Sequence, residues 1–266
     1  MKTLMRLFVF FGMWSGLLIA GCDNTGTPSQ SSSVSQQSAP AQRSGAAAPV
    51  AKSIWPPLPR HDQNIVLMEE DADVLAPSIY FVLDASGSMN DSACGSRDAK
   101  IDIAKKAIQE VFATLDSNVR LGLAVFDRSG IREVVAIGNG PENRQSFMDA
   151  IQGMRAGGGT PLKSAVRLAY GKINAWAQQQ LGYGGYYRLA IVTDGYPDSS
   201  EDPREIVDKI FSESPVDIMT IGFCIGNTHA LNQPGKTTYL EASDYASLRK
   251  GLRTVLAEVP GYADTK

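Results

Sequence analysis

Three oxygen-bearing side chains stand at alternate positions directly after an apolar segment of the chain. Residues 79–83 are all apolar, and Asp84, Ser86 and Ser88 follow them in a short turn that contains glycine. An apolar run of this length, bounded by a polar turn, predicts a strand buried on both faces of a parallel sheet. In open α/β sheets, ligands bind at the carboxyl ends of the strands. One carboxylate and two hydroxyls are hard oxygen ligands, so we predict a site for Mg²⁺ or Mn²⁺ at this strand end.

Two other segments place side chains of the same kind at comparable positions. Residues 156–161 contain three consecutive glycines followed by Thr160 and Pro161, which predicts an N-cap threonine with proline in the first helical position. Residues 189–193 form a second largely apolar run, and Asp194 follows it. Each side chain alone has a structural explanation as a helix cap or a turn residue. Their occurrence together favours one shared site.

The segments between these residues alternate between predicted helices and strands. Apolar residues recur at helical spacing in several stretches, the first of them over residues 98–116. Strands over residues 119–126, with a break at Gly122, and over residues 131–137 are separated by a short turn, which predicts an antiparallel hairpin at one edge. Further helices are expected over residues 142–154, 162–176 and 203–211 and around Leu248, and further strands over residues 189–195, 216–223 and 237–240. The alternation predicts an α/β fold with a doubly wound, mainly parallel central sheet flanked by helices.

Taken together, the three motifs resemble the von Willebrand factor A (vWA) family and its metal-ion-dependent adhesion site (MIDAS). They are Asp-Ala-Ser-Gly-Ser at residues 84–88, Gly-Gly-Gly-Thr-Pro-Leu at residues 157–162 and Thr-Asp-Gly at residues 193–195, and they follow the family's order along the chain. The resemblance covers about residues 77–259. It implies a Rossmann-like vWA fold with one antiparallel edge strand.

The resemblance also implies a role for each of the five site residues. Ser86 and Ser88 would be direct hydroxyl ligands of the ion, and Thr160 would become a ligand when a partner is bound. Asp84 and Asp194 would act mostly through waters or hydrogen-bonded hydroxyls. Neutral hydroxyls leave most of the Mg²⁺ charge uncompensated, and Mg²⁺ keeps waters that another oxygen can replace. The expected partner is therefore a protein that presents a Glu or Asp to the metal.

The first residues predict that the protein is exported to a bacterial cell envelope. Two basic residues precede an apolar run over residues 7–20, which is too short for an ordinary membrane-spanning helix and is typical of a secretory signal peptide at residues 1–21. The run ends in Leu-Ile-Ala-Gly-Cys, which resembles the lipobox of bacterial lipoproteins, where Cys22 would be acylated. A plain signal peptide is the alternative. Asp23 resembles the signal that retains lipoproteins in the inner membrane of enteric-type bacteria, with the outer membrane as the alternative.

Composition divides the rest of the chain. Residues 22–60 are rich in Ser, Gln, Ala and Pro, which predicts a flexible tether after the lipidated cysteine. Residues 61–76 form an extension whose apolar stretch 65–68 fits an edge strand, a lid or a weakly held segment equally well. Residues 77–259 are the predicted vWA domain, and residues 260–266 are a C-terminal tail.

The chain has three cysteines, and two of them remain once Cys22 is lipidated. Cys94 and Cys224 form an even pair in a compartment that permits disulfides. In the family's sheet order, the strand that ends at Asp194 lies between their strands, so the strand ends would be about 10 Å apart. The bridge must then be made by loops, and the loop at residues 90–97 is longer than the family places there. We predict a disulfide that pins this loop beside the metal site, where it shapes which partner fits.

Other chemistries lack their characteristic residues. A phosphoryl-transfer motif of the Asp-x-Asp type would need an acid in place of Ser86, a Gly-x-Ser-x-Gly nucleophile elbow is absent, and the glycine turn lacks the lysine of a P-loop. The two histidines, His61 and His229, are expected at the surface and outside the site. A formal net charge of −3 gives no electrostatic footprint for nucleic acid.

These observations predict a membrane-anchored, metal-dependent protein-binding module and not an enzyme. An adaptor or assembly subunit of an envelope complex is the first alternative, and a metal-dependent hydrolase is the second. The sequence specifies neither the partner protein nor the oligomeric state.

Overall fold

The computed structural model describes residues 76–92, 94–180 and 185–257. The predictions for the signal peptide, for Cys22 and Asp23, for the tether, for residues 61–75 and for the C-terminal tail lie outside these residues. Within the described ranges, no helix has the length and the apolar character needed to cross a membrane.

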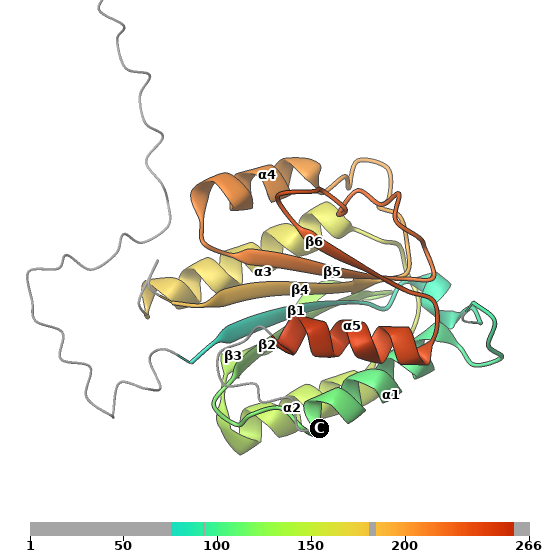
Figure 1. Cartoon of the computed structure of the whole chain (residues 1–266), viewed down its shortest axis with the longest axis horizontal. Coiled ribbons are helices and arrows are strands. Elements are labelled where there is room, and N and C mark those ends of the chain that lie inside the picture. Colours follow the sequence, from blue (N-terminus) through green and yellow to red (C-terminus); the bar gives the residue numbers. More distant parts are fainter. Residues whose placement is uncertain (1–75, 93, 181–184, 258–266) are drawn as a thin grey trace, which may run out of the picture. The chain divides into compact units, whose positions relative to one another are not determined.

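In the described part of the chain, six strands form one sheet in the order β3-β2-β1-β4-β5-β6 (Figure 1). Every neighbouring pair is parallel except β2 and β3, which form an antiparallel hairpin at one edge. The strands are β1 Ser78–Asp84, β2 Arg120–Asp127, β3 Gly130–Gly138, β4 Tyr187–Thr193, β5 Asp217–Phe223 and β6 Thr238–Ala242. The predicted doubly wound, mainly parallel sheet with one antiparallel edge strand is confirmed.

Strand β1 lies between β2 and β4 and is buried along its whole length. Successive side chains of a strand point to opposite faces of the sheet. Ile79, Phe81 and Leu83 accordingly pack into one hydrophobic core, whereas Tyr80 and Val82 pack into the other. A strand covered on both faces requires a continuous apolar run, so the residues that follow β1 emerge at the middle of the sheet's carboxyl edge.

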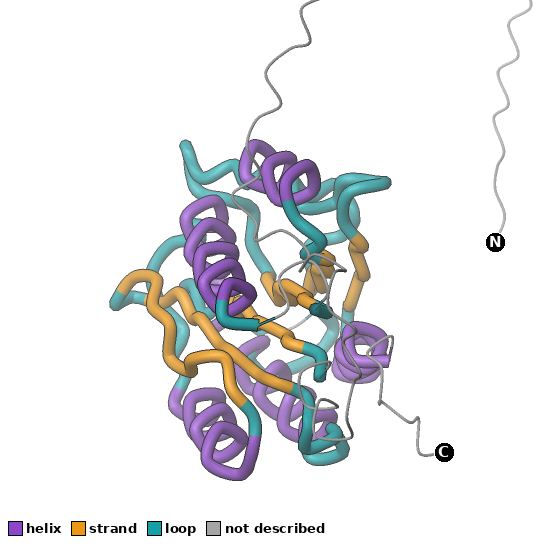
Figure 2. The backbone as a smooth tube through the Cα atoms, turned by 90° about the vertical axis from the view of Figure 1, so that its left-hand side faces the viewer, coloured by secondary structure: helices purple, strands orange, loops and turns teal. Residues whose placement is uncertain are grey.

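Helices cover both faces of the sheet. α1, α2 and α5 pack on one face, below the sheet in Figure 1, and α3 and α4 pack on the other (Figures 1 and 2). They are α1 Lys100–Phe112, α2 Gly140–Gly153, α3 Leu162–Gln178, α4 Arg204–Glu213 and α5 Tyr245–Ala257, and a short 3₁₀ helix, η2 Gly87–Asn90, follows β1. Aromatic rings join the layers, because Phe112 of α1 lies 5.1 Å from Phe81 and 4.6 Å from Phe147 of α2, measured between ring centroids.

Strand β2 runs through Gly122 without the break that the sequence predicts. The register pairs Gly122 with Tyr80 of β1. A Cβ atom at this position would lie 2.5 Å from the Tyr80 ring and 2.8 Å from Ile137, so glycine here makes room for a buried aromatic side chain. The predicted irregularity is present in the pairing with β3, whose register shifts between Leu121 and Leu123, across Gly122, and again between Leu123 and Ala124.

The prediction that Thr160 caps α3 is wrong. The helix begins at Leu162, and Pro161 takes the N-cap position, where its carbonyl accepts the N–H of Ala165 at 2.9 Å. Asp198 holds Thr160 outside the helix, because its carboxylate accepts the Thr160 N–H at 2.8 Å and its own N–H donates to the Thr160 carbonyl at 3.0 Å. The Thr160 side chain is therefore free of a capping role.

Helix α1 begins two residues later than the sequence predicts, at Lys100. The backbone N–H of Lys100 donates to the carbonyl of Asp91 at 3.0 Å, and Ser92 pairs with Ala99 in an isolated antiparallel bridge. These contacts close the residues before Lys100 into a loop and set where the first helical turn starts.

Candidate metal centre

Asp84 ends the central strand with a carboxylate that is almost fully buried, since the residue is 1% exposed. Its Oδ1 accepts the backbone N–H of Ser86 at 2.7 Å, and its Oδ2 accepts the hydroxyl of Thr193 at 2.6 Å. Burial is the largest cause that raises the pKa of Asp84, to about 6, and these hydrogen bonds lower it in part. The site therefore contains a buried acid whose negative charge is poorly compensated.

The two serine hydroxyls of the first motif form a hydrogen-bonded chain that leads to Asp194, the residue after β4. Ser88 Oγ donates to Asp194 Oδ1 at 2.8 Å, and the Oγ atoms of Ser86 and Ser88 lie 3.0 Å apart. A hydroxyl has one proton and two lone pairs. Because Ser88 gives its proton to Asp194, Ser86 is the donor in the contact between the serines, and both oxygens keep a lone pair for another ligand.

Thr160, which ends the glycine turn before α3, places its hydroxyl near the Ser88 hydroxyl. A Cβ atom placed on Gly195 would lie 3.0 Å from Thr160 Oγ1 and 3.7 Å from Ser88 Oγ, so the two hydroxyls converge on the same glycine. The two hydrogen bonds with Asp198 fix the backbone of Thr160, which is 7% exposed. Gly195 thus keeps open the space between the second and third motifs.

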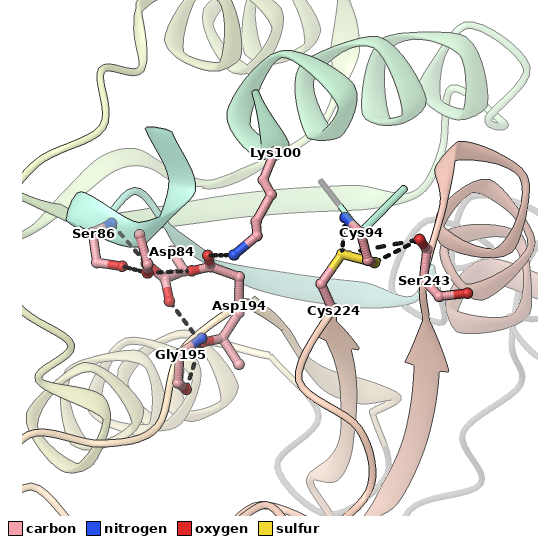
Figure 3. A network of polar contacts seen from close by, with 10 residues as sticks. Asp84, Ser86, Cys94, Lys100, Asp194, Gly195, Cys224 and Ser243 are labelled. Carbon is pink, nitrogen blue, oxygen red and sulfur yellow. Dashed lines mark hydrogen bonds and ion pairs between the residues drawn. A yellow bond between two sulfur atoms is a disulfide. The ribbon is translucent and has the colours of Figure 1, made fainter. Parts of the chain in front are cut away.

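Lys100 contributes a positive charge to the same cluster. Its Nζ lies 2.8 Å from Asp194 Oδ2, and the side chains are 13% exposed for Lys100 and 0% for Asp194. Figure 3 shows the lysine pointing from the start of α1 toward the carboxylate. Sequence reasoning missed this residue, because Lys100 and Asp194 are 94 positions apart and no motif joins them.

The structure brings the five predicted residues together at the carboxyl ends of β1 and β4. These five residues supply two buried carboxylates and three hydroxyls, and Lys100 adds one ammonium, so one negative charge has no cationic partner in the cluster. Such a donor set fits a hard divalent cation, because Mg²⁺ and Mn²⁺ take oxygen ligands. Within the described ranges, no group of three or more His, Cys, Asp or Glu side chains could hold a metal ion.

The predicted disulfide is present between Cys94 and Cys224, whose Cα atoms are 5.8 Å apart (Figure 3). Cys224 directly follows β5, and Cys94 lies in the loop that the Ser92–Ala99 bridge closes. β4 lies between β1 and β5, so the loop after β1 crosses over β4 to reach Cys224, as the sequence predicts. The bond ties the loop before Lys100 to the residue after β5, which lies two strands away from β1.

The prediction that His229 lies at the surface is wrong, whereas His61 lies outside the described residues. His229 is 4% exposed, its Nδ1 accepts the N–H of Leu231, and its Nε2 lies 3.0 Å from the carbonyl of Gly195. Because Nδ1 is an acceptor, Nε2 carries the proton and donates to Gly195. Burial lowers the pKa of this imidazole, so the neutral ring supports the backbone next to Asp194.

The fold and the site together define a class of protein. A mainly parallel Rossmann-like sheet with one antiparallel edge strand carries an oxygen-rich cluster at its carboxyl edge. The sequence profile described as von Willebrand factor type A domain matches residues 78–251. The chain therefore belongs to the von Willebrand factor type A domain family, whose members typically mediate adhesion or assembly between proteins.

Several solved structures share this fold. The minor pilin PilB of Streptococcus sanguinis aligns with a TM-score of 0.54 at 15% identity, over 69% of this chain and 61% of the pilin. BatB of Bacteroides thetaiotaomicron aligns with a TM-score of 0.53 at 15% identity, over 69% of this chain and 98% of BatB. Manganese-loaded TRAP protein of Plasmodium vivax aligns with a TM-score of 0.50 at 17% identity, over 69% of this chain and 74% of TRAP.

At these identities the likeness shows the fold alone, and this chain spans less than two thirds of the pilin's length. A search of curated protein sequences finds no match.

Proposed function

We propose that this chain is a membrane-anchored protein-binding module that captures a carboxylate of a protein partner at a MIDAS, through Mg²⁺ or Mn²⁺. The observation that carries the proposal is the convergence of three hydroxyls and two buried carboxylates where β1 and β4 end. A compact cluster of hard oxygen ligands at the carboxyl edge of a doubly wound sheet is where such folds bind ligands.

Each residue of the cluster has a task in this proposal. Ser86 and Ser88 would hold the ion through hydroxyl oxygens, and Thr160 would become a ligand when a partner is bound. A bound ion would supply the positive charge that attracts an acidic side chain. Asp194 accepts the Ser88 proton, which leaves a lone pair of that hydroxyl available. Asp84 accepts the Ser86 N–H and thereby fixes the turn that carries both serines.

The place of the protein is part of the proposal. Acylation of Cys22 would anchor the chain to a membrane, and Asp23 favours the periplasmic face of the inner membrane. The structural neighbours include a minor pilin, a pilus adhesin and an aerotolerance-related membrane protein, which is consistent with a location in the cell envelope. The proposed activity is binding without catalysis, since the cluster contains no activated nucleophile and its neighbouring histidine is neutral and committed to Gly195.

An adaptor or assembly subunit is a narrower form of the same proposal. It differs in having a permanent partner within an envelope complex, whereas an adhesion module has an exchangeable one. The family, whose members typically mediate adhesion or assembly between proteins, supports either form. Co-purification of one stoichiometric partner at all metal concentrations would indicate the assembly role.

Divalent-ion-dependent capture tests the proposal. The full chain, immobilised, is exposed to envelope extract with Mg²⁺ or with EDTA, and bound proteins are then challenged with free glutamate and with a Glu-containing peptide. We expect capture in Mg²⁺, release by EDTA and competition by the acidic peptide. Asp84→Ala and Thr160→Ala should abolish capture while the fold survives, because both side chains lie at the end of the sheet and not in its apolar core.

The matched control is Asp149→Ala, which removes an exposed carboxylate from α2 that lies outside the cluster. This variant should capture partners as the unaltered chain does. Capture that persists in EDTA, or that survives in both site variants, contradicts the proposed metal dependence.

A further inference from the structure

Lys100 occupies a position that the stability of its own helix does not explain. It is the first residue of α1, and the preceding Ala99 provides no side-chain cap. The first turn of a helix carries a partial positive charge, which disfavours a cation there. The ion pair with Asp194, at 2.8 Å, is therefore the contact that accounts for the orientation of the lysine.

The ion pair uses an atom that belongs to the proposed metal centre. Asp194 accepts Ser88 Oγ through Oδ1 and Lys100 Nζ through Oδ2, so both carboxylate oxygens already have donors. A divalent ion held by Ser88 would lie close to the same carboxylate. Two cations next to one carboxylate repel each other strongly at this burial, because the dielectric screening inside a protein is weak.

The lysine side chain is in part exposed to solvent, whereas its partner is not. It is 13% exposed while the Asp194 side chain is fully buried, so the aliphatic stem reaches the cluster from the solvent side. A lysine has four rotatable side-chain bonds and a compact, strongly hydrated charge. Lys100 can therefore return its ammonium to water without disturbing Asp194 or β4.

The base of the lysine is held, in contrast to its tip. The Lys100 N–H donates to Asp91, and the Ser92–Ala99 bridge and the Cys94–Cys224 disulfide fix the loop before it. The Cα atom of Lys100 therefore stays beside the cluster whether or not the ammonium contacts Asp194. This arrangement keeps the charge at a high local concentration near the site.

We propose that Lys100 is an internal cation that competes with the divalent ion for Asp194 and thereby sets the metal affinity of the site. In this arrangement the ammonium compensates Asp194 when no ion is held, and it withdraws as the ion is taken up. Lys100 is a residue that tunes affinity and is not itself a metal ligand. The inference rests on the proposed function, because it presupposes that the hydroxyl cluster takes a divalent ion.

Isothermal titration of the full-length purified chain with MnCl₂ tests the proposal. Lys100→Met removes the charge and keeps the apolar stem, and it should bind Mn²⁺ about tenfold more tightly or better, because one repulsive charge is lost at short range. Lys100→Arg keeps the charge and should stay within about threefold of the unaltered chain. A lysine with a merely structural role would give the opposite sign, since disturbing the site weakens binding.

Lys106→Met is the matched control. It removes the same charge from the same helix, but Lys106 is exposed and its Nζ lies over the ring of Tyr245, 5.1 Å from the centroid. We expect its Mn²⁺ affinity to stay within about twofold of the unaltered chain, since solvent screens charges separated by about a Debye length. Lys100→Gln provides a second neutral variant that can still donate to Asp194, in case Lys100→Met does not fold.

The outcomes separate this inference from the proposed function. Tighter Mn²⁺ binding by the neutral variants alone supports the competition. Equal Mn²⁺ binding by the unaltered chain and the neutral variants overturns the competition and leaves the metal site standing. Absence of Mn²⁺ binding in every variant, neutral ones included, overturns the proposed metal dependence and this inference with it.

Discussion

Asp84 destabilises the metal-free chain at neutral pH as a consequence of its burial. Burial raises the pKa of this carboxyl from 3.8 to about 6, so folding favours its protonated form. An acid whose pKa is raised in the folded state contributes stability below its unfolded pKa, and that contribution is lost as the pH rises through the folded value. The shift lowers the free energy of unfolding by about 3 kcal/mol, as an order of magnitude, when the pH rises from 4 to 7.

Asp84→Asn should therefore stabilise the metal-free protein at pH 7, by up to about 3 kcal/mol in the free energy of unfolding. The amide oxygen can still accept the Ser86 N–H, so the turn after β1 keeps its anchor. The gain should shrink as the pH falls from 7 toward 4, since the carboxyl of the unaltered chain becomes protonated. Urea unfolding in EDTA across this pH range measures it, and a variant less stable than the unaltered chain at pH 7 contradicts the argument.

The five cluster residues could be predicted from the sequence, but the side chains that hold or compensate them could not. Asp84, Ser86 and Ser88 lie within one short motif, so their proximity follows from their spacing. Lys100 and Asp198 act across 94 and 38 positions, and each contact depends on where another element ends. Local patterns report which residue types are present, whereas these contacts exist only once the sheet is assembled.

At the scale of elements, the same limit explains which boundaries were wrong. The order of helices and strands follows from apolar periodicity, and each predicted element is present. The sequence places the start of α1 two residues too early and makes Thr160 the cap of α3, because the bond from the Lys100 N–H to the Asp91 carbonyl and the bonds between Thr160 and Asp198 are not reported by any propensity. Glycine weakens strands, which favours a break at Gly122, whereas β2 continues past it because its partner Tyr80 needs the space.

The disulfide should stabilise the arrangement of elements around the cluster. It joins residues 130 positions apart, and the chain-entropy model gives a contribution of about 5 kcal/mol for a loop of this length, as an upper value. We expect Cys94→Ser with Cys224→Ser to lower the free energy of unfolding by several kcal/mol, about 3–5, in urea titrations. The unaltered chain in reductant should match the double variant, and equal stability with and without reductant would show that the bond contributes nothing.

The whole molecule assembles its candidate site from three segments that lie far apart along the chain. The first motif follows β1, the second precedes α3, and the third follows β4, which is the hydrogen-bonded neighbour of β1. Parallel strands end at the same edge of a sheet, so the meeting of the first and third motifs follows from topology. The second motif joins them through a backbone contact, because the Gly87 N–H donates to the carbonyl of Gly158 at 3.0 Å. The candidate site therefore lies on one edge of the domain only.

Attachment through Cys22 is the prediction that belongs to this scale. Acyl transfer needs the thiol, so Cys22→Ser should abolish metabolic labelling with palmitate and leave a chain of higher mass, because the signal peptide is not removed. Asp23→Ser should move the protein from the inner to the outer membrane in a cell that sorts lipoproteins in the enteric way, and Asn24→Ser is the matched neighbouring control. Density-gradient fractionation separates the two membranes. Labelling that persists in Cys22→Ser contradicts lipidation, and unaltered protein in the outer membrane contradicts the role of Asp23, because a chain already delivered there has not been retained.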